Sequence, residues 1–278
     1  MPSDFQFDPI AAAIAEDIGD GDVTCQFFVD PHQRGHAQIV AREDSIAAGV
    51  ETAAEVFTRV DPATSVSIVA PSGSRVAPGD TVLEVDGLVA SILTAERVAL
   101  NFLQRLSGVA TITRRYVDAA GDKSIILDTR KTTPCLRALE KKAVVAGGGT
   151  NHRFGLFDMV MVKDNHLAAR NDADAIQSSI ARIKSERPGI RIELEADNLD
   201  QVRMFLGISG IDVILLDNMG LDEMREAVRL GAGKVKFEAS GGVTLERIPE
   251  IAATGVDYIS AGALTHSARA IDFSLELA

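Results

Sequence analysis

The chain has 278 residues, of which 46% are hydrophobic and 24% charged, enough to bury one large core or one core with a smaller companion. It carries 28 Lys and Arg side chains against 40 Asp and Glu side chains, and the net charge of −12 excludes nucleic acid and anionic membranes as general partners. Any anionic ligand must therefore be bound by a local cluster of cations.

The sequence has no feature that is typical of a secreted or membrane-bound protein. The N-terminus lacks the basic region and apolar core of a signal peptide. No stretch holds the roughly 18 uncharged apolar residues that a membrane helix needs. Cys25 and Cys135 form neither a disulfide framework nor a metal-binding cluster, which is typical of a reducing compartment. We therefore expect a globular protein of the cytoplasm.

The first third of the chain predicts a small α+β unit. Residues 9–17 predict a short helix that ends at a turn rich in Gly and Asp. From residue 35 to about residue 87, short alternating runs between Pro-Gly and Asp-Gly turns predict strands, and residues 48–60 among them predict a helix.

The clearest helix of the sequence is predicted at residues 93–108. Its apolar positions recur at Val98, Phe102 and Leu106, and Gly108 supplies a C-terminal stop. We place the boundary between two domains just beyond this helix.

Farther along, buried strands alternate with helices. Six continuous apolar runs predict parallel strands covered by helices, and they begin near residues 124, 158, 190, 211, 234 and 257. The repetition of strand, polar tip and helix indicates either an α/β barrel or a doubly wound sheet. Because the strands are fewer than in a complete barrel, the pattern does not decide whether the sheet closes.

Strand after strand in this part ends in a charged or small polar residue. The residues in question are Arg130, Lys131, Lys163, Glu195, Asp217, Ser240 and Gly262. In a barrel they would all lie at the carboxyl-terminal rim, where such folds carry out their chemistry. A purely structural core has no use for polar strand ends that point the same way, so we expect a functional site here.

Basic residues gather between residues 130 and 163. They are Arg130, Lys131, Arg137, His152, Arg153 and Lys163. Such a set suits a small ligand with several negative charges, since Arg forks onto carboxylate or phosphate and Lys adds a point charge. The alternative is a solvated surface with ordinary ion pairs. We favour that alternative for Lys141 and Lys142 in the middle of a predicted helix, and ligand binding for the cations at strand ends.

Three glycines, residues 147–149, precede His152 and Arg153. One glycine is enough to end a helix, so three favour a tight functional loop, although they can also simply end the preceding helix. His152 is either a satisfied structural histidine or a ligand-binding one, and the neighbouring Arg153 favours the second reading.

Glu195 and Asp217 end two neighbouring strands. Paired carboxylates can hold Mg²⁺, bind a ribose or stabilise a cationic transition state. Glu193 shares a strand face with Glu195, so either can point inward, and we favour Glu195 because it lies nearer the strand end.

Two segments rich in small residues predict a phosphate site. Residues 238–243 contain Ser240, Gly241 and Gly242, and residues 260–267 contain Gly262 and His266. Exposed backbone N–H groups and a helix N-terminus bind phosphate, and barrels often place such a site after their last two strands. The alternative is a pair of glycine turns that pack against the barrel.

Taken together, these motifs closely resemble the quinolinate phosphoribosyltransferase family, the decarboxylating nicotinate-nucleotide pyrophosphorylases of NAD biosynthesis. The resemblance spans nearly the whole chain through "EDIGDGDVT", "ERVALNFLQRLSG", "DTRKTTP", "GGGTNHR", "VKDNH", "ELEAD", "LLDNM", "SGGV" and "GALTHS". It implies an α/β fold with an N-terminal α/β sandwich domain (1–110), on which a C-terminal tail (268–278) can pack, and an incomplete, seven-stranded α/β barrel (111–267). Cys135 departs from the family pattern, which often has glycine there.

The resemblance also implies the reaction and the roles of the site residues. The family transfers the phosphoribosyl group of phosphoribosyl pyrophosphate to quinolinate with Mg²⁺ and then loses CO₂, which gives nicotinate mononucleotide and pyrophosphate. By this resemblance, quinolinate would be bound by Arg130, His152, Arg153 and Lys163. The catalytic residues would be Lys131, Glu195 and Asp217, and the metal would be held by Glu195 and Asp217. A phosphate would be held by Ser240, Gly241, Gly242, Gly262 and His266. Arg97 would reach the partner subunit's site, so that activity requires a homodimer or a higher oligomer.

Two other functions stay open. A related phosphoribosyltransferase for another base, such as nicotinate, would need fewer cations, so the basic set favours the diacid. A non-catalytic barrel that senses a phosphorylated ligand would gain nothing from Glu195 and Asp217.

Overall fold

The structure is a computed structural model that describes residues 7–167 and 172–278. The chain divides into two compact units. Unit 1 comprises Met1–Arg114, Thr132–Gly148 and Leu264–Ala278, and unit 2 comprises Arg115–Lys131 and Gly149–Ala263. Within the described residues, no helix combines the length and the apolar character required to cross a membrane.

Unit 1 contains a four-stranded sheet in the order β12-β1-β5-β3, with all neighbours antiparallel. Its strands are β1 (Arg34–Ala41), β3 (Ser65–Ile68), β5 (Thr81–Leu88) and β12 (Phe273–Leu277). A separate pair joins β2 (Ser45–Ile46) and β4 (Arg75–Val76). The helices are α1 (Pro9–Ile18), α2 (Val23–Phe28), α3 (Val50–Val60), α5 (Arg137–Ala146), α11 (Ala263–His266) and most of α4 (Val89–Ala120).

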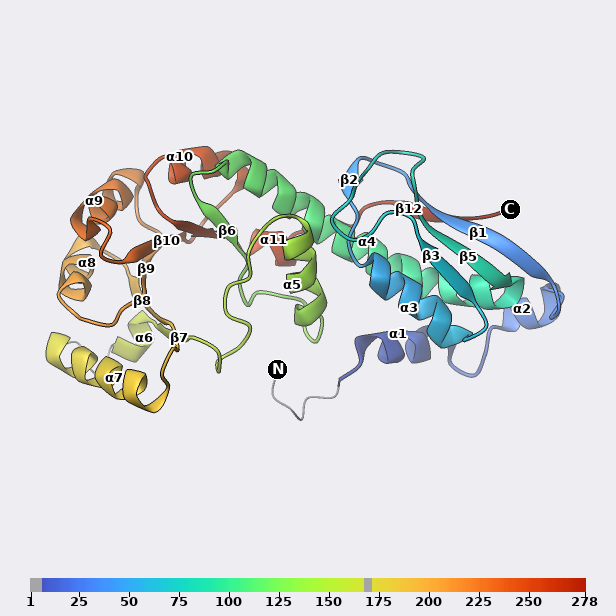
Figure 1. Cartoon of the computed structure of the whole chain (residues 1–278), viewed down its shortest axis with the longest axis horizontal. Helices are drawn as coiled ribbons and strands as arrows, with labels where there is room; N and C mark the ends of the chain where they lie inside the picture. The colour runs from blue at the N-terminus through green and yellow to red at the C-terminus, as the bar shows by residue number, and fades with distance from the viewer. Residues whose placement is uncertain (1–6, 168–171) are drawn as a thin grey trace. The chain divides into compact units, whose positions relative to one another are not determined.

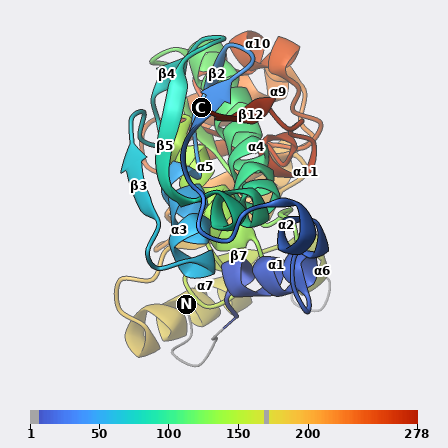
Figure 2. The same ribbon diagram turned by 90° about the vertical axis from the view of Figure 1, so that its right-hand side faces the viewer.

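The core of unit 1 follows from two periodicities. Along β1, Ala37, Ile39 and Ala41 alternate with less buried residues, as on one face of a strand. In α3, Val50, Ala53, Val56 and Phe57 form one buried stripe, and α3 lies alongside β3 and β5 (Figure 1, Figure 2). The helices predicted at 9–17 and 48–60 and the strands among them are confirmed.

The long helix α4 runs through the predicted helical segment but does not stop at Gly108. A Cβ at this position would overlap the carbonyl oxygen of Arg269, so glycine serves close packing of the C-terminal segment against the helix. The predicted helix is therefore confirmed, and the predicted stop is wrong.

Helix α5 corrects a prediction about Lys141. Glu140, Lys141, Ala143 and Val144 are buried on one face of the helix, and the Arg105 guanidinium pairs with Glu140 at 2.7 Å. Lys141 therefore belongs to the packed interior, whereas Lys142 is exposed as predicted.

The glycines after α5 have structural explanations. A Cβ at Gly147 would overlap the carbonyl oxygen of Ala110, and Gly148 has a φ of +89°, which favours glycine. These two positions therefore serve the helix end and do not require a functional loop.

Unit 2 is built on six parallel strands in the order β6-β11-β10-β9-β8-β7. They are β6 (Ile125–Leu127), β7 (Val160–Val162), β8 (Ile192–Ala196), β9 (Val213–Asp217), β10 (Lys236–Ser240) and β11 (Tyr258–Ser260). Helices α6 (Asp164–Leu167), α7 (Ala173–Glu186), α8 (Leu199–Leu206), α9 (Leu221–Gly231) and α10 (Ile248–Ala252) and the 3-10 turn η1 (Leu245–Arg247) connect them. In Figure 1, α7, α8 and α9 lie along the outside of the strands.

All six predicted strands are present, and the predicted α/β class with a barrel-like domain is confirmed. Thr150 forms an isolated parallel bridge with Leu127, on the side of β6 that does not pair with β11. The seventh strand implied by the family resemblance is thus reduced, among the described residues, to this single bridge.

Candidate active site

A cavity of about 480 Å³ opens in unit 2 at the carboxyl ends of the parallel strands. Nine of the predicted site residues line it: Arg130, Lys131, His152, Arg153, Lys163, Asp217, Ser240, Gly241 and Gly242. They come from segments far apart in the sequence, and they meet because parallel strands present their carboxyl ends at the same edge.

Four of these lining residues are cations, namely Arg130, Lys131, Arg153 and Lys163. The pKa of Arg153 is lowered, mainly by burial and in addition by the positive charge of Arg130. The two guanidinium groups therefore repel each other beside the cavity, and an anionic ligand between them would relieve this repulsion.

Glu195 does not line the cavity itself, but it contacts a residue that does. Its carboxylate is buried and pairs with the Nζ of Lys163, which follows the neighbouring strand β7. Ligand oxygens of Glu195, Asp197 and Asp217 all lie within 4.8 Å of one another. Three carboxylates are a donor set that suits Mg²⁺, so these residues fit the metal implied by the resemblance.

The sequence interpretation missed Asp197 as a member of this carboxylate group. Its signal was present, because Asp197 follows Glu195 by two positions and so shares its side of the strand end.

A tight turn at Ser240, Gly241 and Gly242, at the end of β10, lines another part of the cavity and contacts Asn218, which follows β9. Asn218 has a φ of 54°, and its N–H donates to the carbonyl oxygen of Ser240 at 2.9 Å. Gly241 and Gly242 have φ values of +87° and +56°, and a Cβ on Gly241 would overlap the Asn218 side chain. Glycine is therefore required at Gly241, because the missing side chain makes room for Asn218.

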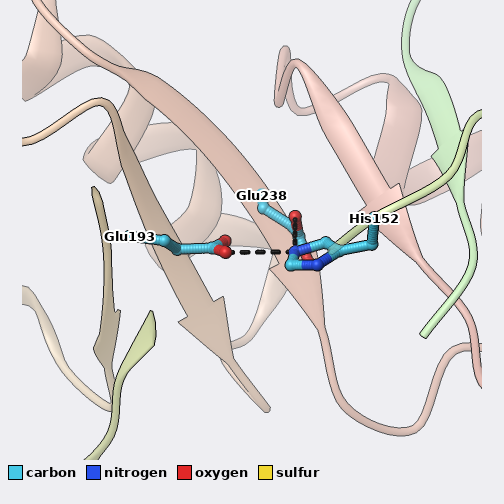
Figure 3. Close-up of side chains that lie close together, drawn as sticks. All are labelled: His152, Glu193 and Glu238. Carbon is cyan, nitrogen blue, oxygen red and sulfur yellow. Dashed lines mark hydrogen bonds and ion pairs between the residues drawn. The ribbon is translucent and has the colours of Figure 1, made fainter. Parts of the chain in front are cut away.

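His152 is held by two carboxylates beside the cavity (Figure 3). Its Nε2 lies 3.0 Å from Glu193 Oε2 and 3.3 Å from Glu238 Oε2. Burial by itself would lower the pKa of His152, but the two carboxylates have the larger effect, so the pKa is raised. The N–H of Arg153 donates to Nδ1, and this contact opposes a second proton on that nitrogen. The pKa of Glu193 is raised to about 7. Burial is the main cause and the charge of Glu238 adds to it, whereas the contact with His152 acts in the opposite direction.

Glu193 and Glu238 were not among the predicted site residues. Glu193 was weighed only as an alternative to Glu195, and both turn out to be buried. Glu238 stands between Phe237 and Ala239 in a buried strand, and a lone carboxylate in such a run was the available signal.

Four residues considered for the site lie elsewhere. Gly262 follows β11 in unit 2 but does not line the cavity. Arg97 lies on α4 in unit 1, with its side chain 61% exposed, and Arg137 lies on α5 and donates to Thr132. His266 lies in the α11 segment of unit 1, exposed, with Nδ1 2.7 Å from Ser267 Oγ.

Comparison with known proteins agrees with this arrangement. Residues 22–107 match the family described as quinolinate phosphoribosyl transferase, N-terminal domain, and residues 109–276 match the corresponding C-terminal domain. The chain is 43% identical to a probable nicotinate-nucleotide pyrophosphorylase (carboxylating) of Bacillus subtilis, over 94% of this chain and 90% of that protein. It is 42% identical to a quinolinate phosphoribosyltransferase (decarboxylating) of Nicotiana tabacum named as mitochondrial, over 95% of this chain and 80% of that protein.

Solved structures give the same result. The fold superposes on NadC from Streptococcus pyogenes with a TM-score of 0.91 and 40% identity, over 97% of this chain and 95% of that one. Nicotinate-nucleotide pyrophosphorylase from Francisella tularensis gives a TM-score of 0.90 at 37% identity, over 97% and 94% of the two chains. With matches to both domains and relatives near 40% identity over most of its length, the chain belongs to the quinolinate phosphoribosyltransferase family.

Proposed function

We propose that the protein transfers the phosphoribosyl group of phosphoribosyl pyrophosphate to the ring nitrogen of quinolinate, with loss of CO₂ and pyrophosphate, to give nicotinate mononucleotide. The observation that carries this proposal is one cavity at the strand ends whose lining combines four cationic side chains with Asp217 and a glycine turn. Both substrates are polyanions in a protein whose net charge is −12, so such a local set of cations is what their binding requires.

Quinolinate would bind between Arg130 and Arg153. Each guanidinium can fork onto one carboxylate, which fixes the plane of the pyridine ring and directs its nitrogen at the anomeric carbon. The repulsion that already lowers the pKa of Arg153 supports this position, because a dianion would offset it.

Phosphoribosyl pyrophosphate would lie between the carboxylates and the turn. Glu195, Asp197 and Asp217 would hold Mg²⁺, which when bound neutralises the charge of the departing pyrophosphate. The same carboxylates stabilise positive charge that develops on the ribose, and Lys131 binds the phosphates at the cavity wall.

The 5′-phosphate would bind the backbone of the tight turn. Ser240, Gly241 and Gly242 supply N–H groups and a hydroxyl without side chains in the way. Gly262, which follows the neighbouring strand β11, would complete this phosphate site in the working enzyme.

Decarboxylation follows from the first step. Once the ring nitrogen carries the ribose it is cationic, and its positive charge stabilises the electron pair that stays on the adjacent ring carbon when the bond from that carbon to the carboxylate breaks and CO₂ leaves. A proton then replaces the carboxylate on that carbon. In this step the cavity keeps the remaining carboxylate of the pyridine ring bound.

The assembly and location are part of the same proposal. The protein would act as a homodimer, or within a higher oligomer, in which Arg97 of one subunit enters the site of the other; its exposed position on α4 is compatible with this role. Two free cysteines support a reducing compartment, which we take to be the cytoplasm.

Direct assay tests the function. The protein is incubated with phosphoribosyl pyrophosphate, Mg²⁺ and either quinolinate or nicotinate, and nicotinate mononucleotide and CO₂ are measured. We expect CO₂ and nicotinate mononucleotide in equal amounts from quinolinate, and little turnover of nicotinate because a monoacid leaves one guanidinium unpaired. Faster conversion of nicotinate would refute the diacid specificity, and no conversion of either would refute the function.

A further inference from the structure

The side chains of His152, Glu193 and Glu238 form a buried hydrogen-bonded trio beside the candidate active site. They are only 8%, 1% and 2% exposed. Figure 3 shows both carboxylates directed at the same ring nitrogen, Nε2. A nitrogen that faces two carboxylates carries a proton, so Nε2 is the donor of this trio.

The trio joins segments that are separate in the sheet. Glu193 lies on β8 and Glu238 on β10, with β9 between them. The backbone N–H of His152 donates to Asp128 Oδ1 at 2.9 Å, just beyond β6. Two strands of the sheet therefore hold the imidazole through Nε2, and Asp128 holds the main chain of the same residue. Together these contacts fix the orientation of the imidazole.

The second ring nitrogen connects this anchor to Arg153. The Arg153 N–H donates to His152 Nδ1 at 2.7 Å. Both ring nitrogens are thus engaged within the protein, and the position of the imidazole determines where the Arg153 main chain lies. Arg153 in turn lines the cavity beside Arg130.

Stability does not explain why two carboxylates are buried here. Taking a carboxylate out of water is costly, and apolar residues of similar volume often replace buried ionic groups without loss. In addition, Glu193 Oε1 and Glu238 Oε1 are buried without a hydrogen-bond partner in the described part of the chain. A buried polar atom without a partner calls for an explanation other than stability, and a role at a functional site is one such explanation.

We propose that Glu193 and Glu238 are positioning residues for the ligand's carboxylate: they hold His152 through Nε2 and, through His152, set the place of Arg153. This inference rests on the proposed function, because the ligand it concerns is quinolinate. Glu193 is the more informative of the two, since it does not line the cavity and can act only through its neighbours, whereas Glu238 does line it.

Steady-state kinetics of single variants test the role of Glu193. Glu193→Ala should raise the KM for quinolinate on the order of tenfold, as is typical for a partner that orients a ligand-binding imidazole. Glu193→Gln keeps an oxygen acceptor for Nε2 and should recover part of this loss. The KM for phosphoribosyl pyrophosphate should stay within about twofold, and Glu250→Ala, at an exposed position of α10, serves as the control. An unchanged KM for quinolinate in the folded Glu193→Ala protein would overturn the proposal.

A double-mutant cycle tests whether Glu193 acts through the imidazole. On a His152→Asn background, Glu193→Gln should have no further effect on the KM for quinolinate, because the connection is already lost. Effects that simply add would show that Glu193 acts independently of His152, and the proposal would then be wrong.

Spectroscopy of the unmutated protein covers the case in which a variant does not fold. In the unmutated protein labelled with ¹⁵N and ¹³C, the imidazole resonances of His152, assigned by sequential triple-resonance spectra, should show a proton on Nε2. An unprotonated Nε2 would contradict the trio directly. If the unmutated enzyme turns over quinolinate and either of these tests fails, only the positioning role falls; if it does not turn over quinolinate, the proposed function falls first.

Discussion

The Nζ of Lys163, the residue that follows β7, pairs with the buried carboxylate of Glu195 on the neighbouring strand β8. Lys163 thus occupies one of the three carboxylates that we assign to the metal, while it also lines the cavity. In the proposed arrangement, Lys163 would therefore lie where the binding regions of the two substrates meet.

Loss of this cation should therefore impair catalysis. We expect Lys163→Gln to lower kcat/KM for both substrates by about 100-fold, because a positive charge in the site is removed and the buried Glu195 loses its partner. Lys142→Gln, on the exposed face of α5, is the matched control and should stay within about twofold. Comparable losses of kcat/KM in the two variants would show that Lys163 is not part of the active site.

Arg130 should act on quinolinate alone. Arg130→Ala should raise the KM for quinolinate by about 100-fold, because a bidentate charge-assisted contact is lost, and Arg130→Lys should restore little since ammonium cannot fork. Circular dichroism checks the fold, and Arg187→Ala at an exposed position is the control. An unaltered KM for quinolinate would remove Arg130 from the site.

The carboxylate Asp197 should govern the metal requirement. Asp197→Asn should increase the Mg²⁺ concentration for half-maximal activity by about tenfold, because one charged ligand of three becomes neutral. Binding of Mn²⁺ followed by electron paramagnetic resonance gives a readout that does not depend on turnover. Asp200→Asn, whose side chain is 93% exposed, should change neither measurement. Equal effects of the two substitutions would exclude Asp197 as a ligand.

Hybrid dimers should test the role of Arg97. Chains carrying Arg97→Ala and chains carrying Lys163→Ala should each be inactive, since each lacks one cation of every site. After subunit exchange, the mixture should recover about a quarter of the normal activity, because half of the dimers then contain one intact site out of two. No recovery despite demonstrated exchange would mean that Arg97 serves the site of its own chain or none.

Cys135 offers a test of backbone conformation. Its φ of 65° is in the left-handed region, where glycine is favoured. We expect Cys135→Val to lower the free energy of unfolding by about 1–2 kcal/mol and Cys135→Gly to leave it equal or higher. Chemical denaturation measures both, and a more stable Val variant would contradict the assigned conformation.

The sequence predicted what depends on local pattern. The six strands of unit 2 were recognisable as continuous apolar runs, and the cations at their ends followed from where the runs stop. The burial of Lys141 and the trio around His152 were not predictable in this way. A charged side chain is buried only where partners arrive from distant segments, and the pattern around Glu238 or Lys141 does not reveal those partners.

Gly108 is a second residue whose role depends on a distant segment and could not be predicted from its neighbours in the sequence. Its use as a packing contact depends on Arg269, far along the chain, whereas its immediate neighbours favour a helix end. Arg97 and His266 belong to unit 1, and their predicted roles remain predictions.

The strand β12 has a consequence for synthesis of the protein on the ribosome. It pairs with β1, so the sheet of unit 1 joins the beginning of the chain to its last residues. The strands of unit 2 lie wholly between these two ends. During translation, unit 2 can therefore complete its sheet first, while β1 keeps an unpaired edge until β12 emerges from the ribosome.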